Sequence, residues 1–225
     1  MVDSDARKAF RRCLYPLRNA CLRASENNEI WRIYQIDRHK HYQIMNEYHG
    51  FFACSIHAHF VATLVALGIL YEKDSDSYNL HELIKYAEEH KLIQTRVLDK
   101  QKIRLHKVSK IAHNLWKIRS KAFAHMDTKL SYETVLSKFP FTPKQLTQLI
   151  LTAKRILKDI FYAFEKDDSG NFQIGARTDT LALLAVLKKA KRMKIKKPKP
   201  SGRPTFIDSM LRQAQQSNLI ARNVK

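Results

Sequence analysis

The segment TPKQLTQLILTAKRILKDIFYAF, residues 142–164, indicates the fold class most clearly. Thr142 and Pro143, with Gln145 at the third helical position, are typical of a helix start, because a Thr side chain can accept a bond from an unpaired backbone N–H and Pro suits the first turn. Apolar residues then recur in steps of three and four, the period of one helix face. They are Leu146, Leu149, Ile150, Ala153, Ile156, Leu157, Ile160 and Phe164. The segment therefore predicts an amphipathic helix with one buried face.

The same spacing predicts further helices on both sides of this segment. They cover the first 24 residues or so, residues 30–48, 51–71 and 80–90, a long segment from about residue 97 to at least residue 122, and a last segment that starts near Thr178 and ends in the basic tail. Pro16 is expected to kink or split the first helix, and Asn79 followed by Glu82 predicts a capped start for the fourth. With only 5 Gly and 6 Pro, the chain has few hairpin signals. We expect an all-α fold, a helical bundle of four or more long helices.

The charge is strongly positive and concentrated toward the C-terminus. The formal net charge is +20, of which residues 188–225 carry +11 (12 Lys and Arg, and Asp208 as the one acid), leaving +9 for residues 1–187. We therefore expect a bundle domain over residues 1–187 and a basic, Pro-punctuated tail over residues 188–225. Such a surface favours nucleic acid as a partner, RNA or also DNA through the tail. The candidate phosphate-binding residues are Lys188, Lys189, Lys191, Arg192, Lys194, Lys196, Lys197, Lys199 and Arg203.

The remaining composition favours a cytoplasmic protein. The three cysteines, Cys13, Cys21 and Cys54, all lie among apolar residues, as reduced core cysteines do. The N-terminal residues lack the apolar region of a signal peptide. The longest apolar run, residues 60–71, is shorter than the ~20 residues that span a bilayer, so it predicts a buried helix and no membrane partner. His and Cys spacing suggests no metal site.

Two polar residues interrupt the apolar stripes of the helix predicted over residues 97–122. One stripe passes through Leu105, Val108, Ala112 and Leu115 and reaches Arg119; a neighbouring stripe passes through Ile111, Leu115, Ile118 and Ala122 and reaches His125. A buried Arg is costly unless it is paired, so this end of the helix is expected to meet a polar cleft or an interface. Positions six apart on a straight helix point about 120° away from each other. Convergence therefore needs a broken helix, a long reach of the Arg side chain, or a two-fold partner.

The segment IRSKAFAHMD, residues 118–127, resembles the R-x(4–6)-H signature of HEPN ribonucleases, closest to the abortive-infection (AbiU-like) branch. The helix order over roughly residues 40–165 is also similar to that branch. The resemblance implies a homodimeric, metal-independent endoribonuclease without a cofactor, acting in phage defence or as a toxin. The 2′-hydroxyl of RNA would attack the adjacent phosphate and leave a cyclic phosphate. An antitoxin or defence partner is a further implication.

The resemblance also implies roles for four residues. His125 would move the proton, because His titrates near neutrality, and Arg119 would bind the phosphoryl oxygens. Lys121 would assist electrostatically and Asp127 would orient the His. Many family nucleases carry Asn, Asp or His directly after the Arg, where this chain has Ser120, and the branch controlled by nucleotide modification carries Tyr where this chain has Asp127.

Two other classes stay open on the sequence. One is a non-catalytic nucleic-acid-binding bundle. Ser120, which departs from the family pattern, and the high net charge both favour it. The other is a helical adaptor whose charge serves an acidic protein or a membrane surface. RNA binding without cleavage would favour the first, and no binding to RNA or DNA at low salt would favour the second.

Overall fold

The computed structural model describes residues 4–74, 76–120, 141–166 and 175–192. In these residues the chain forms helices and no strand, which confirms the predicted all-α class. The helices are α1 (Ser4–Gln35), α2 (Arg38–Glu47), α3 (His49–Tyr71), α4 (Leu80–Glu89), α5 (Thr95–Ile118), α7 (Pro143–Glu165) and α8 (Ala176–Arg192). By its contacts the chain divides into residues 1–186 and 187–225. Of the second unit the structure describes residues 187–192, the end of α8.

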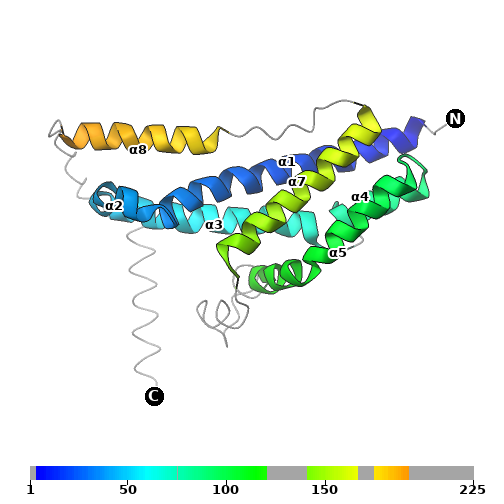
Figure 1. Ribbon diagram of the computed structural model, residues 1–225, viewed down its shortest axis with the longest axis horizontal. Coiled ribbons are helices and arrows are strands. Elements are labelled where there is room, and N and C mark those ends of the chain that lie inside the picture. Colours follow the sequence, from blue (N-terminus) through cyan, green and yellow to red (C-terminus); the bar gives the residue numbers. More distant parts are fainter. Residues whose placement is uncertain (1–3, 75, 121–140, 167–174, 193–225) are drawn as a thin grey trace, which may run out of the picture. The chain divides into compact units, whose positions relative to one another are not determined.

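Helix α1 is the long central element of the first unit and contacts α2, α3, α4 and α7 (Figure 1). Its buried face is built from residues such as Phe10, Leu14 and Leu17. Pro16 does not split the helix, contrary to one of the two expected outcomes. Pro16 lies on the exposed face of α1. The backbone carbonyl that loses its helical hydrogen bond because proline has no N–H can therefore bond to water instead.

The helix predicted over residues 30–48 is wrong as a single element. The chain leaves the helix at Ile36 and Asp37, whose backbone N–H groups both donate to the carbonyl of Arg32, at 2.8 and 3.1 Å. Asp37 (φ −87°, ψ 12°) then starts α2, and its carboxylate pairs with Lys40 at 2.8 Å. An acid is favourable at this end of a helix because of the helix dipole.

Helix α3 is apolar along its whole length but buried only in part. Leu64, Leu67 and Leu70 are fully buried, whereas Phe51 near the start is 56% exposed. Among the described residues this is the one helix long and apolar enough to cross a membrane by length and composition, with a mean hydropathy of 1.8 over its most apolar 18 residues, a third of them buried. The helix predicted over residues 51–71 is confirmed, with two further residues at its start, and most of its buried residues lie in the apolar run 60–71, as predicted. The C-terminal half is core and the N-terminal half is largely surface.

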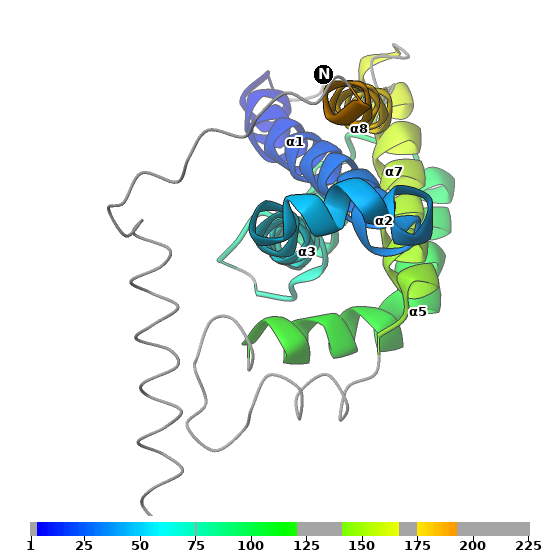
Figure 2. The same ribbon diagram turned by 90° about the vertical axis from the view of Figure 1, so that its left-hand side faces the viewer.

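Helix α7 begins and packs as predicted. Thr142 accepts a bond from the backbone N–H of Gln145, whose side chain accepts from the backbone of Thr142 in return, a complete capping box. All eight predicted core positions of this helix are buried. Each large aliphatic side chain buried in this way contributes about 1.5–3 kcal/mol. Helix α7 contacts α1, α3 and α5, and Figure 2 shows it reaching from α1 toward α5.

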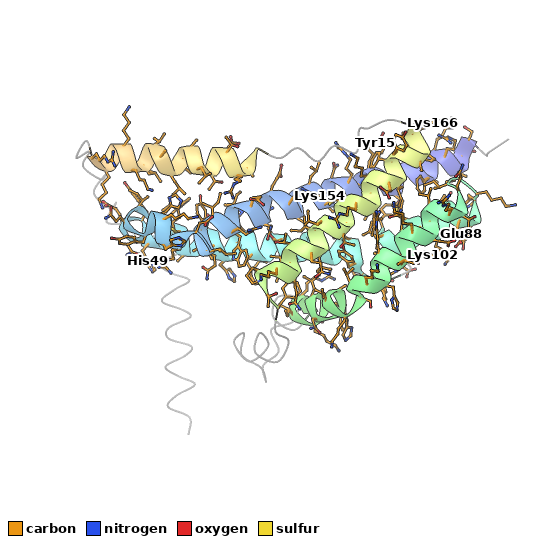
Figure 3. The ribbon with its side chains drawn as sticks, in the orientation of Figure 1. Tyr15, His49, Glu88, Lys102, Lys154 and Lys166 are labelled. Carbon is orange, nitrogen blue, oxygen red and sulfur yellow. The ribbon has the colours of Figure 1, made fainter. Side chains whose placement is uncertain are left out.

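Helices α4 and α5 pack as a pair that contacts the same core. Asn79 caps α4 as predicted, accepting from the backbone N–H groups of His81 and Glu82, both at 2.9 Å. The ammonium of Lys102 on α5 lies 2.6 Å from the carboxylate of Glu88 on α4 (Figure 3). Leu98, Leu105 and Val108 are buried and hold α5 against the core, so that its far end carries Arg119 to a defined place.

Candidate functional site

Arg119 lies where the α-helical part of α5 ends. Leu105, Val108 and Leu115 line the buried face of that helix, and residues 119–120 then take a π-helical turn. The backbone N–H of Arg119 bonds to the carbonyls of Leu115 and Trp116. The α-helix ends at Ile118, and the predicted end, at Ala122 or beyond, lies outside the described residues. A π-helical turn requires a local change of hydrogen bonding, and such turns are frequent at functional sites.

The guanidinium of Arg119 is paired with a carboxylate from a different helix. Nη2 donates to Oε1 of Glu72 at 2.8 Å, and Nη1 donates to Oε2 at 3.3 Å. The two side chains are 24% and 23% exposed, so the pair is partly desolvated yet reachable from solvent. This two-point geometry fixes both the position and the plane of the guanidinium.

Gly68 provides the space in which this guanidinium lies. A Cβ atom at position 68 would lie 2.8 Å from Cδ and 3.2 Å from Cζ of Arg119, and closer still to Nη1. Any side chain there would therefore displace the Arg. Gly68 is one turn before Glu72 on α3, and the backbone N–H of Glu72 bonds to the carbonyl of Gly68 at 2.9 Å. The last turn of α3 thus supplies both the surface and the counter-charge for Arg119.

A tyrosine fixes this end of α3 from the other side. The hydroxyl of Tyr71 donates to the backbone carbonyl of Leu149 on α7 at 2.6 Å. Burial raises the pKa of Tyr71 well above its ordinary value, so the phenol stays protonated and remains a donor at physiological pH. Because Tyr71 holds α3 to α7 while Glu72 holds it to α5, the site rests on three helices.

The arrangement can hold one anionic oxygen group next to a fixed cation. An Arg side chain has five N–H donors, of which Glu72 takes two, so donors of Arg119 remain for a further acceptor. No group of three or more His, Cys, Asp or Glu side chains that could hold a metal ion occurs among the described residues. The chemistry that this part of the site offers is electrostatic binding of a phosphate or carboxylate.

Most of the other predicted site residues fall outside the described part of the chain. This holds for Lys121, His125 and Asp127, so the position of His125 relative to Arg119 stays a prediction. Of the predicted phosphate-binding residues, the last turns of α8 contain Lys188, Lys189, Lys191 and Arg192. The rest, Lys194, Lys196, Lys197, Lys199 and Arg203, also lie outside the described residues.

Sequence reasoning missed Gly68 and Glu72. One signal was present: a buried Arg demands a partner, and Glu72 is the first acidic or basic residue after an apolar helix of 23 residues. Its spacing of four from Gly68 places both on one helix face. Arg119 is thus paired in a half-buried place, as the cost of burying a lone Arg requires.

Comparison with known protein families gives a match over most of the chain. The family model described as AbiU2, a HEPN family, matches residues 7–179. The chain therefore belongs to the AbiU2 family of HEPN domains, an abortive-infection family. No curated protein and no solved structure matches it.

Proposed function

We propose that this protein is a metal-independent endoribonuclease that acts in the cytoplasm in phage defence or as a toxin. One observation carries the proposal most directly: in a chain of the AbiU2 family, the Arg of the R-x(4–6)-H signature is held in a fixed orientation by Glu72 over Gly68.

In the proposed reaction the 2′-hydroxyl of a ribose attacks the adjacent phosphate. His125 moves the proton, which requires a group that titrates near neutrality. Arg119 binds the non-bridging oxygens as negative charge develops on them, and Lys121 adds positive charge nearby. Asp127 orients the His. The products are a 2′,3′-cyclic phosphate and a free 5′-hydroxyl, with no metal or cofactor involved.

The Glu72 pair supports the role of Arg119 through preorganisation. A free Arg side chain carries about 2 kcal/mol of rotamer entropy, and this cost is met in folding when Glu72 holds the side chain. The remaining N–H donors of Arg119 are then already oriented when a phosphate binds to them. The carboxylate also offsets one positive charge, so that the ground-state phosphate is not held too tightly for turnover.

We further propose a homodimer, because a two-fold partner would bring a second Arg119–His125 pair to the same place and remove the 120° difficulty along one helix. An antitoxin or another defence protein would then control activity. The basic segment from Lys188 to Arg203 would add sequence-independent affinity for RNA, and possible affinity for DNA.

The test is incubation of the purified protein with cellular RNA in excess EDTA, followed by analysis of the product ends. We expect cyclic-phosphate ends with the natural chain and none with His125→Ala or Arg119→Ala. Cleavage that persists in both variants would refute the assigned residues. Intact RNA that is nevertheless shifted on a native gel would refute the enzyme and leave the non-catalytic nucleic-acid-binding bundle, which the net charge of +20 favours.

A further inference from the structure

A basic groove follows the contact between α5 and α7, away from the end of α5 that carries Arg119. It consists of two adjoining cavities of about 1040 and 1400 Å³, which share Arg104 and Lys107 on α5. The first cavity extends past the end of α1 to the start of α7, and the second extends to Tyr162 near the end of α7. We call the two cavities together the α5–α7 groove. Its span along α7, from Thr142 to Tyr162, is about 30 Å at 1.5 Å per residue.

All the charged side chains that line the first cavity of the groove are cations. They are Arg32, Arg104, Lys107, Lys144 and Arg155. Three of them, Lys107, Lys144 and Arg155, form no side-chain ion pair or hydrogen bond within the described part of the chain. They can therefore bind an anion without breaking an internal bond. A concave wall of one charge sign concentrates the field and attracts anions.

The second cavity contains carboxylates, but the groove stays positive there. Asp159 bonds to Arg104 at 2.8 Å and to Lys100 at 3.2 Å. Burial acts to raise the pKa of Asp159, yet the bonds from these two cations outweigh it and lower the pKa. The carboxylate is therefore charged at neutral pH and is used to position Arg104. With Lys158 also in the lining, the cations outnumber the acids.

Apolar and aromatic side chains alternate with these cations along the groove. Leu151 lies in the first cavity, and Ile103 and Tyr162 lie in the second. All three are strongly exposed, Tyr162 to 65%. Exposed apolar surface next to cations suits a ligand with both anionic and flat apolar parts. Single-stranded nucleic acid is such a ligand, because its phosphates bind cations while its bases stack on aromatic and aliphatic surfaces.

We propose that the α5–α7 groove binds a single strand of RNA along its two cavities. The inference rests on the proposed ribonuclease function, for which the groove supplies a surface that holds the substrate strand. A strand is favoured over a mononucleotide because the cations are spread over both cavities rather than gathered at one point. Phosphates bind Lys107, Lys144 and Arg155, and bases pack on Tyr162 and its apolar neighbours.

The test measures binding with an RNA that cannot be cleaved. A fluorescent 2′-O-methyl single strand of twelve nucleotides is titrated with the full chain and followed by anisotropy at several salt concentrations. The groove variant is Lys107→Ala, Lys144→Ala and Arg155→Ala together. The control variant, Arg12→Ala, Arg23→Ala and Lys73→Ala, removes the same charge from exposed residues that line neither cavity.

We expect the groove variant to bind at least about 10-fold more weakly, with a salt slope reduced by about 2, since each single-strand phosphate contact contributes about 0.7. The control should bind within about 2-fold of the natural chain, and Tm should be unchanged in both. Equal weakening in the two variants overturns the groove, because binding then follows net charge alone. Displacement of the strand by an equal concentration of AMP also overturns it, in favour of a mononucleotide site.

A separate cleavage assay with natural RNA distinguishes this inference from the proposed function. Groove-dependent binding without any cleavage supports the groove and removes the nuclease. Cleavage that is lost in Arg119→Ala but unaffected in the groove variant supports the nuclease and removes the groove. A Tyr162→Ala variant should lose a further few-fold in binding without changing the salt slope, because stacking releases no counterion.

Discussion

A methyl group added at Gly68 should disable the site while leaving the fold nearly as stable as before. In Gly68→Ala the new Cβ would lie 2.8 Å from Cδ and 3.2 Å from Cζ of Arg119, where carbon atoms prefer about 3.5–4.0 Å. The Arg side chain must therefore move by about 1 Å. Its second bond to Glu72 is already 3.3 Å long, so a shift of this size breaks the two-point geometry.

The stability change combines two opposed contributions. Ala in place of Gly inside a helix gains about 1 kcal/mol. Loss of the partly exposed ion pair costs on the order of 1 kcal/mol. The free energy of unfolding should thus change little, and Tm should stay within about 4 °C for a chain of this size. Displacement of a catalytic group by about 1 Å is expected to lower the cleavage rate about 100-fold.

Gly50→Ala is the matched control in the same helix. Nothing lies within 4 Å of a Cβ at position 50, so this variant should cleave at the natural rate. Cleavage rates on one RNA in EDTA and thermal melts followed by circular dichroism measure both properties. Full activity in Gly68→Ala would refute the idea that cleavage depends on the position of Arg119 over Gly68. A fall in Tm of more than 10 °C would show that the Arg119 side chain cannot move aside as reasoned.

Three further results are expected. In Glu72→Gln, Arg119 loses its charged partner, so we expect the cleavage rate in the EDTA assay to fall at least 10-fold. The free energy of unfolding, measured with urea, should fall by about 1–3 kcal/mol. An unchanged cleavage rate would contradict the positioning role of Glu72. Asn79→Ala removes a helix cap and should cost about 0.5–2 kcal/mol of unfolding free energy without affecting cleavage, which the same two measurements check. The pKa of Asp159 is lowered in the folded state, so its contribution to stability is complete above the unfolded pKa of about 4 and is lost as pH falls through the folded pKa. Thermal melts from pH 7 to pH 3 should therefore show a smaller fall in Tm for Asp159→Asn than for the natural chain. Parallel curves of Tm against pH would contradict this.

The elements of the fold were predictable where local signals agree. The capping box at Thr142 and the apolar stripe behind it both predict α7, and the structure has both. The cap at Asn79 was equally readable. The break at Asp37 was not, because no Gly or Pro marks it and the residues on both sides keep helical spacing. Of the two outcomes expected at Pro16, the structure excludes the split, which the sequence could not decide because the effect of a proline depends on whether it faces solvent.

The candidate site was predictable only in part. Arg119 stood out because a cation occupied an apolar stripe. Its partner Glu72 is 47 residues away in the chain, and such a pairing arises from the packing of α3 against α5 rather than from any local pattern. Gly68 was unreadable for the same reason: a glycine in an apolar helix has several explanations until the neighbour that needs the space is known.

The start of α1 is tied to the end of α7. Arg11 bonds to Glu165 through two contacts of 2.7 and 2.8 Å, and Arg7 donates to the carbonyl of Phe164. During translation α1 is therefore synthesised well before α7, because 130 residues separate Gln35 from Glu165. Their synthesis takes roughly 7–26 seconds at about 5–20 residues per second. Throughout that time the apolar face of α1 lacks its last partner on the ribosome. A chain that ends before Glu165 lacks these contacts, so the start of α1 is held in place only after all of α7 has been synthesised.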